Sequence, residues 1–229
     1  MENEKNLSPQ ESLSIIQTML KKAHSESYNE SGTSAIMWGI VTSVCGFVQA
    51  AEIYWNFYIG FDIWLLTVIA IIPQVYISIS EVKNKIVRTY EEEFIGAVWI
   101  VFALTIFALA AYAHISPNAL EKLFSAEKNQ LLIKNLTDNT VQIWHPYALS
   151  ICSLYLMIYA IPTLMTGLVT KFKPMIAGAI LCYILFIISL YTSFTVGMVL
   201  MAVSGIFNWL IPGFILRRKY LRLGRKQYV

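Results

Sequence analysis

Long apolar runs alternate with short polar stretches along the chain from residue 35 onwards. A helix of roughly 20 apolar residues is long enough to cross a hydrocarbon core of ~30 Å. Six segments have this character: Ala35 to Tyr54, Ile63 to Ser80, Phe94 to Ala113, Tyr147 to Thr170, Met175 to Leu190 and Phe194 to Leu216. The pattern predicts an all-α polytopic membrane protein, with a six-transmembrane-helix bundle over residues 31–216.

Composition agrees with a bilayer as the solvent. Hydrophobic residues make up 57% of the chain and charged residues 14%, with a mean hydropathy of +0.58, beyond the range of an ordinary soluble domain. The first thirty residues show no cleavable signal peptide, so the first span is expected to be an uncleaved anchor. Cys45, Cys152 and Cys182 all fall inside apolar runs, which argues against a disulfide framework.

Residues 1–30 predict a cytoplasmic amphipathic helix. Ser8-Pro9-Gln10-Glu11 has the spacing of a capping box with proline at the first helical position. Leu13, Ile16 and Leu20 follow on one face. Three roles stay open for this helix: docking on its own bundle, lying on the membrane surface, or packing on a partner.

Basic residues set the expected orientation. Fourteen of the seventeen Lys and Arg residues fall on segments that would face the cytoplasm if the N-terminus does. Residues 217–229, a basic cytoplasmic tail, hold six of them. This bias predicts a bacterial inner-membrane protein with both termini inside, and a tail that contacts anionic lipid headgroups rather than nucleic acid. The six tryptophans lie at or near predicted span ends, as in interfacial belts.

Two connections are longer than a turn. Residues 82–93 are expected to be helical, with the acidic run Glu91-Glu92-Glu93 at a favourable helix start; a diacidic metal or catalytic site is the alternative. Residues 114–146 are expected to form an outer loop in which a short helix begins at Ser116-Pro117.

A group of polar residues maps to the outer ends of the first four spans. Its members are Gln49, Glu52, Asp62, His114 and His145. They are either separate solvated side chains or parts of one outward-facing pocket, in which two His and two carboxylates would suit a divalent metal. No local His spacing supports a metal, and no metal or other cofactor is predicted. More interior positions, Gln74 and Asn208, are expected to form interhelical hydrogen bonds.

Small residues and prolines mark the helix contacts and bends. A set of small residues at four-residue spacing in the first span predicts close packing, either within the bundle or across a homodimer: Ala35, Gly39, Ser43, Thr42, Gly46 and Ala50. Pro73, Pro162 and Pro212 each follow isoleucine in an outside-to-inside span. They indicate three related hairpins or three similar kinks, and are candidate hinges.

Four short motifs resemble an uncharacterised family of six-span bacterial inner-membrane proteins. They are Trp38-Gly39, Val87-Arg88-Thr89-Tyr90, Lys171-Phe172-Lys173-Pro174 and Leu210-Ile211-Pro212-Gly213. The resemblance implies the architecture and the compartment. Because that family has no established activity, it implies no substrate or site.

Function is constrained chiefly by what the spans lack. No Asp, Glu, Lys, Arg or His lies near an expected midplane, and the standard nucleophile, zinc-protease and phosphate-loop motifs are missing, so no catalytic residue is assigned. The leading hypothesis is a non-enzymatic interaction, accessory or signal-responsive membrane protein. A small transporter or channel for a neutral or lipophilic solute is the alternative. A membrane enzyme ranks third, because it would require the outer polar residues to meet.

Overall fold

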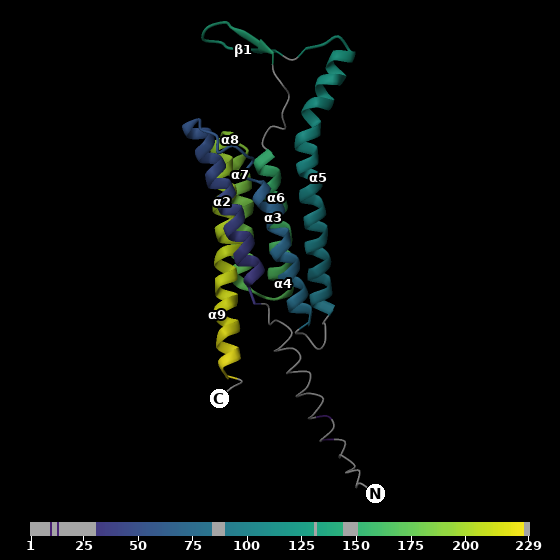
Figure 1. Cartoon of the computed structure of the whole chain (residues 1–229), viewed down its shortest axis with the longest axis vertical. Coiled ribbons are helices and arrows are strands. Elements are labelled where there is room, and N and C mark those ends of the chain that lie inside the picture. Colours follow the sequence, from purple (N-terminus) through teal and green to yellow (C-terminus); the bar gives the residue numbers. More distant parts are fainter. Residues whose placement is uncertain are drawn as a thin grey trace.

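The computed structural model describes residues 31–83, 90–130, 132–143 and 151–226, together with Gln10 and Leu13. Helices run along one long axis and a small β-hairpin stands at one end (Figure 1). Apart from Gln10 and Leu13, the predicted amphipathic helix of residues 1–30 lies outside the described residues, as does His145.

In the part of the chain that the structure describes, four helices are long and apolar enough to cross a membrane: Thr33–Trp55, Tyr90–Ala126, Ile151–Val169 and Phe194–Arg222. Two shorter apolar segments, Leu65–Glu81 and Lys173–Ser189, run beside them (Figure 1). The prediction of a helical, membrane-type fold is therefore confirmed. Within the described residues, the β-hairpin is the departure from an all-helical architecture.

Helix α2 (Thr33–Trp55) is bounded by backbone in the left-handed region at both ends. Gly32 precedes it with φ 68°, and Asn56 ends it with φ 51° while donating its N–H to the Glu52 carbonyl. An added Cβ at Gly32 would lie 2.5 Å from the Gly213 carbonyl oxygen of α9. The helix therefore needs glycine at its entry, for both conformation and space.

Helices α3 (Leu65–Ile69) and α4 (Ile71–Lys83) form one interrupted rod. Pro73 has no N–H to donate to the Ile69 carbonyl, which accounts for the break at Ala70 one turn earlier. The Trp38 indole of α2 donates to the Gln74 side-chain oxygen at 2.9 Å, confirming the interhelical hydrogen bond expected at Gln74.

Helix α5 (Tyr90–Ala126) is longer than expected. It continues through His114, Ser116 and Pro117, so the prediction that a separate short helix starts at Ser116-Pro117 is wrong. Pro117 cannot bond the Ala113 carbonyl. The residues that follow, Ala119-Leu120-Glu121-Lys122, are good helix formers, and they carry the helix onward. At 1.5 Å per residue its 37 residues span about 55 Å.

Strands β1 (Leu132–Lys134) and β2 (Val141–Ile143) pair antiparallel, with Leu132 opposite Ile143. All six strand residues are exposed. The turn is held by the Asp138 carboxylate, which accepts hydrogen bonds from the Thr140 hydroxyl at 2.8 Å and its N–H at 3.2 Å. The segment predicted as an outer loop therefore holds a helix end and a hairpin.

Helices α6 (Ile151–Val169) and α7 (Lys173–Ser189) form a tight hairpin. The turn uses Lys171 at φ 52°, and Pro174 lies in the first turn of α7, where its missing N–H costs little. A Cβ at Gly167 would lie 2.9 Å from the Ile176 side chain, so the two helices meet closely at their turn.

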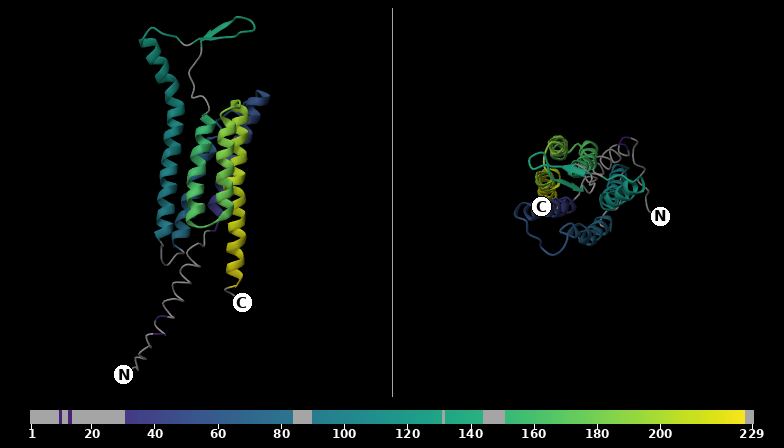
Figure 2. Two further views of the ribbon diagram at one scale, coloured as in Figure 1. Left: turned by 180° about the vertical axis from the view of Figure 1, so that it is seen from behind. Right: turned by 90° about the horizontal axis from the view of Figure 1, so that it is seen from above.

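The last rod consists of α8 (Phe194–Gly205), the π-helical turn η1 (Ile206–Leu210) and α9 (Ile211–Lys226). α9 continues past the other helices, so the basic tail is helical as far as Lys226 (Figure 1). α2 lies along this rod, and α7 fills its other side. α5 stands at the edge of the assembly, and its backbone meets that of α6 alone among the described elements (Figure 2).

Candidate functional site

The π-turn η1 lies at the centre of the packed helices and is tied to the proline that follows it. Pro212 has no N–H for the Asn208 carbonyl four residues earlier. The Ile211 N–H instead donates to the Ile206 carbonyl, five residues back. Such π-turns inside α-helices occur frequently at functional sites. Here the turn directs Asn208 and Trp209 toward α6.

Side-chain hydrogen bonds hold the π-turn to α6. The Asn208 amide nitrogen donates to the Tyr159 carbonyl at 3.0 Å, which confirms the interhelical hydrogen bond expected at Asn208. The Trp209 indole donates to the Thr163 hydroxyl at 3.0 Å, and that hydroxyl donates to the Tyr159 carbonyl at 3.2 Å. Asn208 is fully buried and Trp209 is 4% exposed. Among the described buried side chains, Asn208 Oδ1 and Thr166 Oγ1 have no hydrogen-bond partner.

Glycines let neighbouring helices reach the turn. Gly178 of α7 touches the Phe207 carbonyl and the Asn208 Cα, and a Cβ at Gly205 would lie 2.9 Å from the Ser43 hydroxyl of α2. The Ser43 hydroxyl lies within hydrogen-bond distance of the carbonyls of Gly39 at 2.7 Å and Ala202 at 2.9 Å. The turn is therefore enclosed by α2, α6 and α7.

An aromatic cluster joins α5 to this centre. We define it as Trp99 and Phe102 of α5 with Tyr159 of α6 and Trp209 of η1. Trp99 and Phe102 lie 6.4 and 6.1 Å from the Trp209 ring, and Phe102 lies 6.1 Å from Tyr159. Tyr159 and Trp209 are 4.9 Å apart. These edge-on and tilted contacts attach α5 to the same two residues that take part in the hydrogen bonds of the π-turn.

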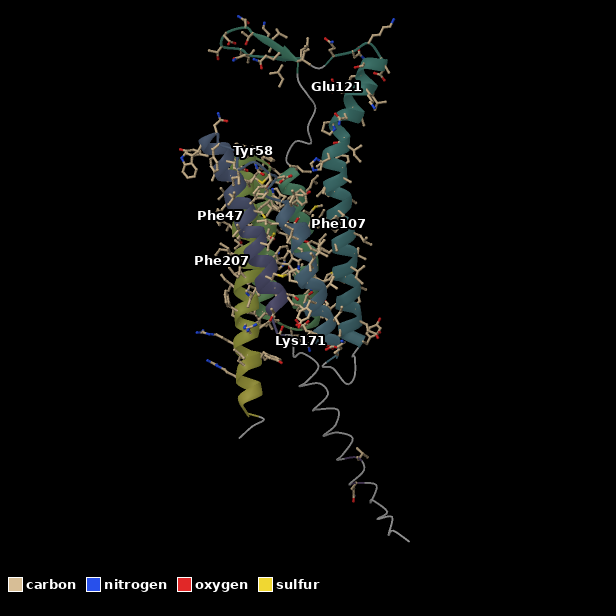
Figure 3. The ribbon with its side chains drawn as sticks, in the orientation of Figure 1. Phe47, Tyr58, Phe107, Glu121, Lys171 and Phe207 are labelled. Atoms are coloured by element: carbon tan, nitrogen blue, oxygen red, sulfur yellow. The ribbon has the colours of Figure 1, made fainter. Side chains whose placement is uncertain are left out.

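The strip of α5 that adjoins Trp99 on the side away from Phe102 is uncovered by the described chain. Gly96, Ile100, Ala103 and Phe107 follow one another at intervals of four, three and four residues, and all are exposed; we call them the open face of α5. Within the most apolar window of α5, 6% of the residues are buried, against 50% for α6 and for the rod of α8 to α9. Figure 3 marks Phe107 on this helix.

Gly96 differs from most other described helical glycines. Seven other helical glycines would each place a Cβ 2.9 Å or less from an atom of a neighbouring helix: Gly39, Gly46, Gly167, Gly178, Gly197, Gly205 and Gly213. At Gly96, no atom of the described residues lies within 4 Å of that position. Gly96 of α5 therefore makes no close contact with another described helix, unlike those seven glycines.

The polar residues predicted at the outer end take separate positions. The Glu52 carboxylate is 7% exposed and accepts the Ile59 N–H at 3.0 Å, so it fastens the loop that follows its own helix. Asp62 is exposed and accepts the Trp64 N–H at 2.9 Å at the entry to α3. Both carboxylates satisfy local backbone donors, a role that spacing along the sequence did not reveal.

His114 does not join that end of α2. Gln49 lies one turn before Glu52, whereas His114 is exposed on α5, whose described backbone neighbour is α6. His145 lies outside the described residues. Within the described ranges, no three His, Cys, Asp or Glu side chains come together as a metal site. The acidic run of residues 91–93 lies in the first turn of α5, where the helix dipole favours negative charge.

The small residues of α2 lie in contacts within the chain. Gly39 meets Leu210, and Gly46 meets Met198 and Ala202. The others follow the same side: Ala35 lies near Gly213, while Thr42, Ser43 and Ala50 are buried. Their spacing allowed close packing either within the bundle or across a homodimer, and these contacts lie within the bundle.

The prolines and tryptophans occupy more varied positions than their repeated pattern suggested. Pro73 follows a break, Pro162 lies inside the continuous α6, and Pro212 follows the π-turn. Trp209, expected in an interfacial belt, is instead buried and hydrogen-bonded. The aromatic cluster was therefore missed from the sequence, although Trp99 and Phe102 at three-residue spacing were its available signal.

Two hollows on the described surface are each lined by one helix. One lies against Tyr76, Ile79, Ser80 and Lys83 of α4, and the other along α5 near Glu121, a residue marked in Figure 3. Neither is lined by Glu52, His114, Gln74 or Asn208, the polar residues that a solute pathway could use.

Comparisons with models of protein families, with curated proteins and with solved structures found no match for the chain. The resemblance to a six-span bacterial family stays a prediction.

Proposed function

We propose that the chain crosses a bacterial inner membrane six times, with both termini in the cytoplasm. Four long apolar helices and two apolar segments of 17 residues run side by side. Seventeen helical residues span about 25 Å, close to the ~30 Å core. The orientation rests on the basic residues of the α6–α7 turn and of α9, which lie at one end of the bundle.

Within that membrane, we propose a non-enzymatic interaction protein whose partner-binding span is α5. The observation that carries the proposal is Gly96: it has the residue type found at the other helix contacts, but open space in place of a neighbour. Small residues allow two membrane helices to approach closely, because van der Waals packing and not the hydrophobic effect joins them in lipid. The open face alternates small and large side chains, which suits interdigitation with a second helix.

The attachment of α5 supports a signal-responsive form of this role. Trp99 and Phe102 of α5 contact Trp209. The open face adjoins them, because Gly96 and Ala103 each lie one turn from Trp99. A helix bound at the open face would therefore press on the same rings that lie beside the π-turn. A partner that binds α5 more tightly in one position than in another would shift α5 toward that position. The difference between the two affinities would supply the free energy that couples binding to the π-turn.

Site-specific photo-crosslinking in native membranes tests the proposal. A photoreactive residue at Ile100 of the open face, 64% exposed, is compared with one at Ile187 of α7, 55% exposed. We expect a discrete protein adduct from position 100 and lipid adducts alone from position 187. Lipid adducts alone from both positions would refute the partner-binding role of α5, because both sites would then face bulk bilayer.

The transporter alternative has one observation in its favour, the unpaired Asn208 Oδ1 in the interior. A solute would need a path to that atom. The enclosure of the π-turn by α2, α6 and α7 counts against such a path. The enzyme alternative loses its basis because Glu52 and Asp62 are engaged locally and His114 lies on α5.

A further inference from the structure

Basic side chains gather at the end of the bundle from which α9 projects. Lys171 and Lys173 belong to the α6–α7 turn, marked by Lys171 in Figure 3, and Arg217, Arg218, Lys219 and Arg222 belong to α9. All six are exposed. α7 and α9 contact one another, which brings the two basic groups to adjoining elements. We call them the basic rim.

The basic rim has no acidic counterpart in the described chain. Arg217 donates to the Thr33 hydroxyl at 2.9 Å, and none of the six forms an ion pair there. The Glu81 carboxylate of α4 accepts a hydrogen bond from Ser31 at 2.7 Å. Among the described residues, the positive charge of the rim is therefore not neutralised by a carboxylate.

Apolar side chains border the rim on the bundle side. Leu168, 58% exposed, precedes Lys171 by one turn, and Phe214, 51% exposed, precedes Arg217 by one turn. The surface thus offers cations beside exposed hydrocarbon, on two helices, at one end. A ligand that matches both must carry an anionic head and an apolar tail.

We propose that the basic rim binds the phosphate of an anionic phospholipid, whose acyl chains lie against the apolar border. Lys171 has left-handed backbone in a tight turn, which sets the direction of its Cα–Cβ bond. Each basic residue near an anionic lipid surface contributes about 1 kcal/mol, roughly a fivefold factor in affinity. The proposal does not depend on the partner-binding role of α5.

Native mass spectrometry of the full chain in a neutral detergent tests it, with phosphatidylglycerol as the probe and phosphatidylcholine as the neutral comparison. We expect tighter binding of phosphatidylglycerol, weakened roughly tenfold or more by the double variant Lys171→Gln, Lys173→Gln. The pair Arg217→Gln, Arg218→Gln should weaken it similarly. These residues are exposed, and melting curves verify that each variant is folded.

The matched control is Lys122→Gln with Lys128→Gln at the far end of α5. It removes the same charge, and Lys128 also has left-handed backbone, at φ 58°. We expect it to leave lipid affinity unchanged. An equal loss in the control, equal affinity for the two lipids, or displacement of the lipid by inorganic phosphate alone would each overturn the proposal, the last by identifying a soluble-anion site.

Discussion

Gly39 of α2 lies so close to Leu210 of η1 that an added Cβ would stand 2.6 Å from the Leu210 backbone nitrogen. The contact sets the separation of the first and last rods. Replacing Gly39 with valine should therefore lower the free energy of unfolding by at least about 3 kcal/mol, because backbone cannot yield as a side-chain tip can. Thermal or denaturant unfolding in a fixed detergent measures the loss.

Gly96→Ala provides the control, because Gly96 faces open space. It should raise stability by roughly 0.5–1 kcal/mol, the usual gain for alanine over glycine in a helix. If Gly39→Val unfolded at the same denaturant concentration as the wild type, the close contact of α2 with η1 would be wrong.

Two loop glycines separate backbone strain from steric conflict. Gly32 has φ 68° and the Gly213 carbonyl beside it, while Gly60 has φ 101° and nothing within 4 Å of its Cβ position. Gly60→Ala should cost about 1–3 kcal/mol from conformation alone. Gly32→Ala should cost more, since it adds the clash with α9. Equal melting temperatures for the two variants would contradict the close contact between Gly32 and the Gly213 carbonyl.

The hydrogen bond from Trp209 to Thr163 can be isolated by a double-mutant cycle. Trp209→Phe and Thr163→Val each remove one partner of the 3.0 Å contact. We expect a coupling energy of about 0.6 kcal/mol, and not above about 1.7, as for other hydrogen bonds between membrane helices. Additive losses would show that the two groups do not interact.

The hairpin carries a pH-dependent contact. Hydrogen bonds from the Thr140 hydroxyl and N–H hold the pKa of Asp138 below its ordinary value. These hydrogen bonds thus stabilise the hairpin at pH values above the ordinary pKa of aspartate. The stabilisation is lost as the pH falls through the lowered pKa of Asp138. Thr140→Val should raise the Asp138 pKa toward the ordinary value, as followed by NMR titration of labelled aspartate. An unchanged midpoint would exclude the hydroxyl as the main cause.

The hydropathy pattern was sufficient to predict apolar helices, because helix formation depends on local sequence. Four of the helices in the described chain are long and apolar enough to cross a membrane, and two predicted spans are shorter. The pattern failed at Pro117. The sequence suggested a helix start there, but the good helix formers after it sustain α5 through Ala126. At Gln74 and Asn208 the expected interhelical hydrogen bonds are present, since a polar side chain inside a span has few other partners.

The site was harder to predict, because it depends on which helix faces meet. Spacing placed Glu52 and His114 at the same end, yet Glu52 bonds the Ile59 N–H in its own loop and His114 lies on α5. Spacing also could not distinguish Gly96 from Gly39. The difference between a packed and an open glycine exists only once the helices are assembled.

The central claim is that the open face of α5 binds a partner helix, and Gly96→Leu tests it most directly. A Cβ at this position has no atom of the described chain within 4 Å, so the variant should melt no lower than the wild type. Photo-crosslinking from Ile100 should then lose its discrete protein adduct in the variant and keep it in Gly96→Ala. A full yield of that adduct in Gly96→Leu would contradict the account.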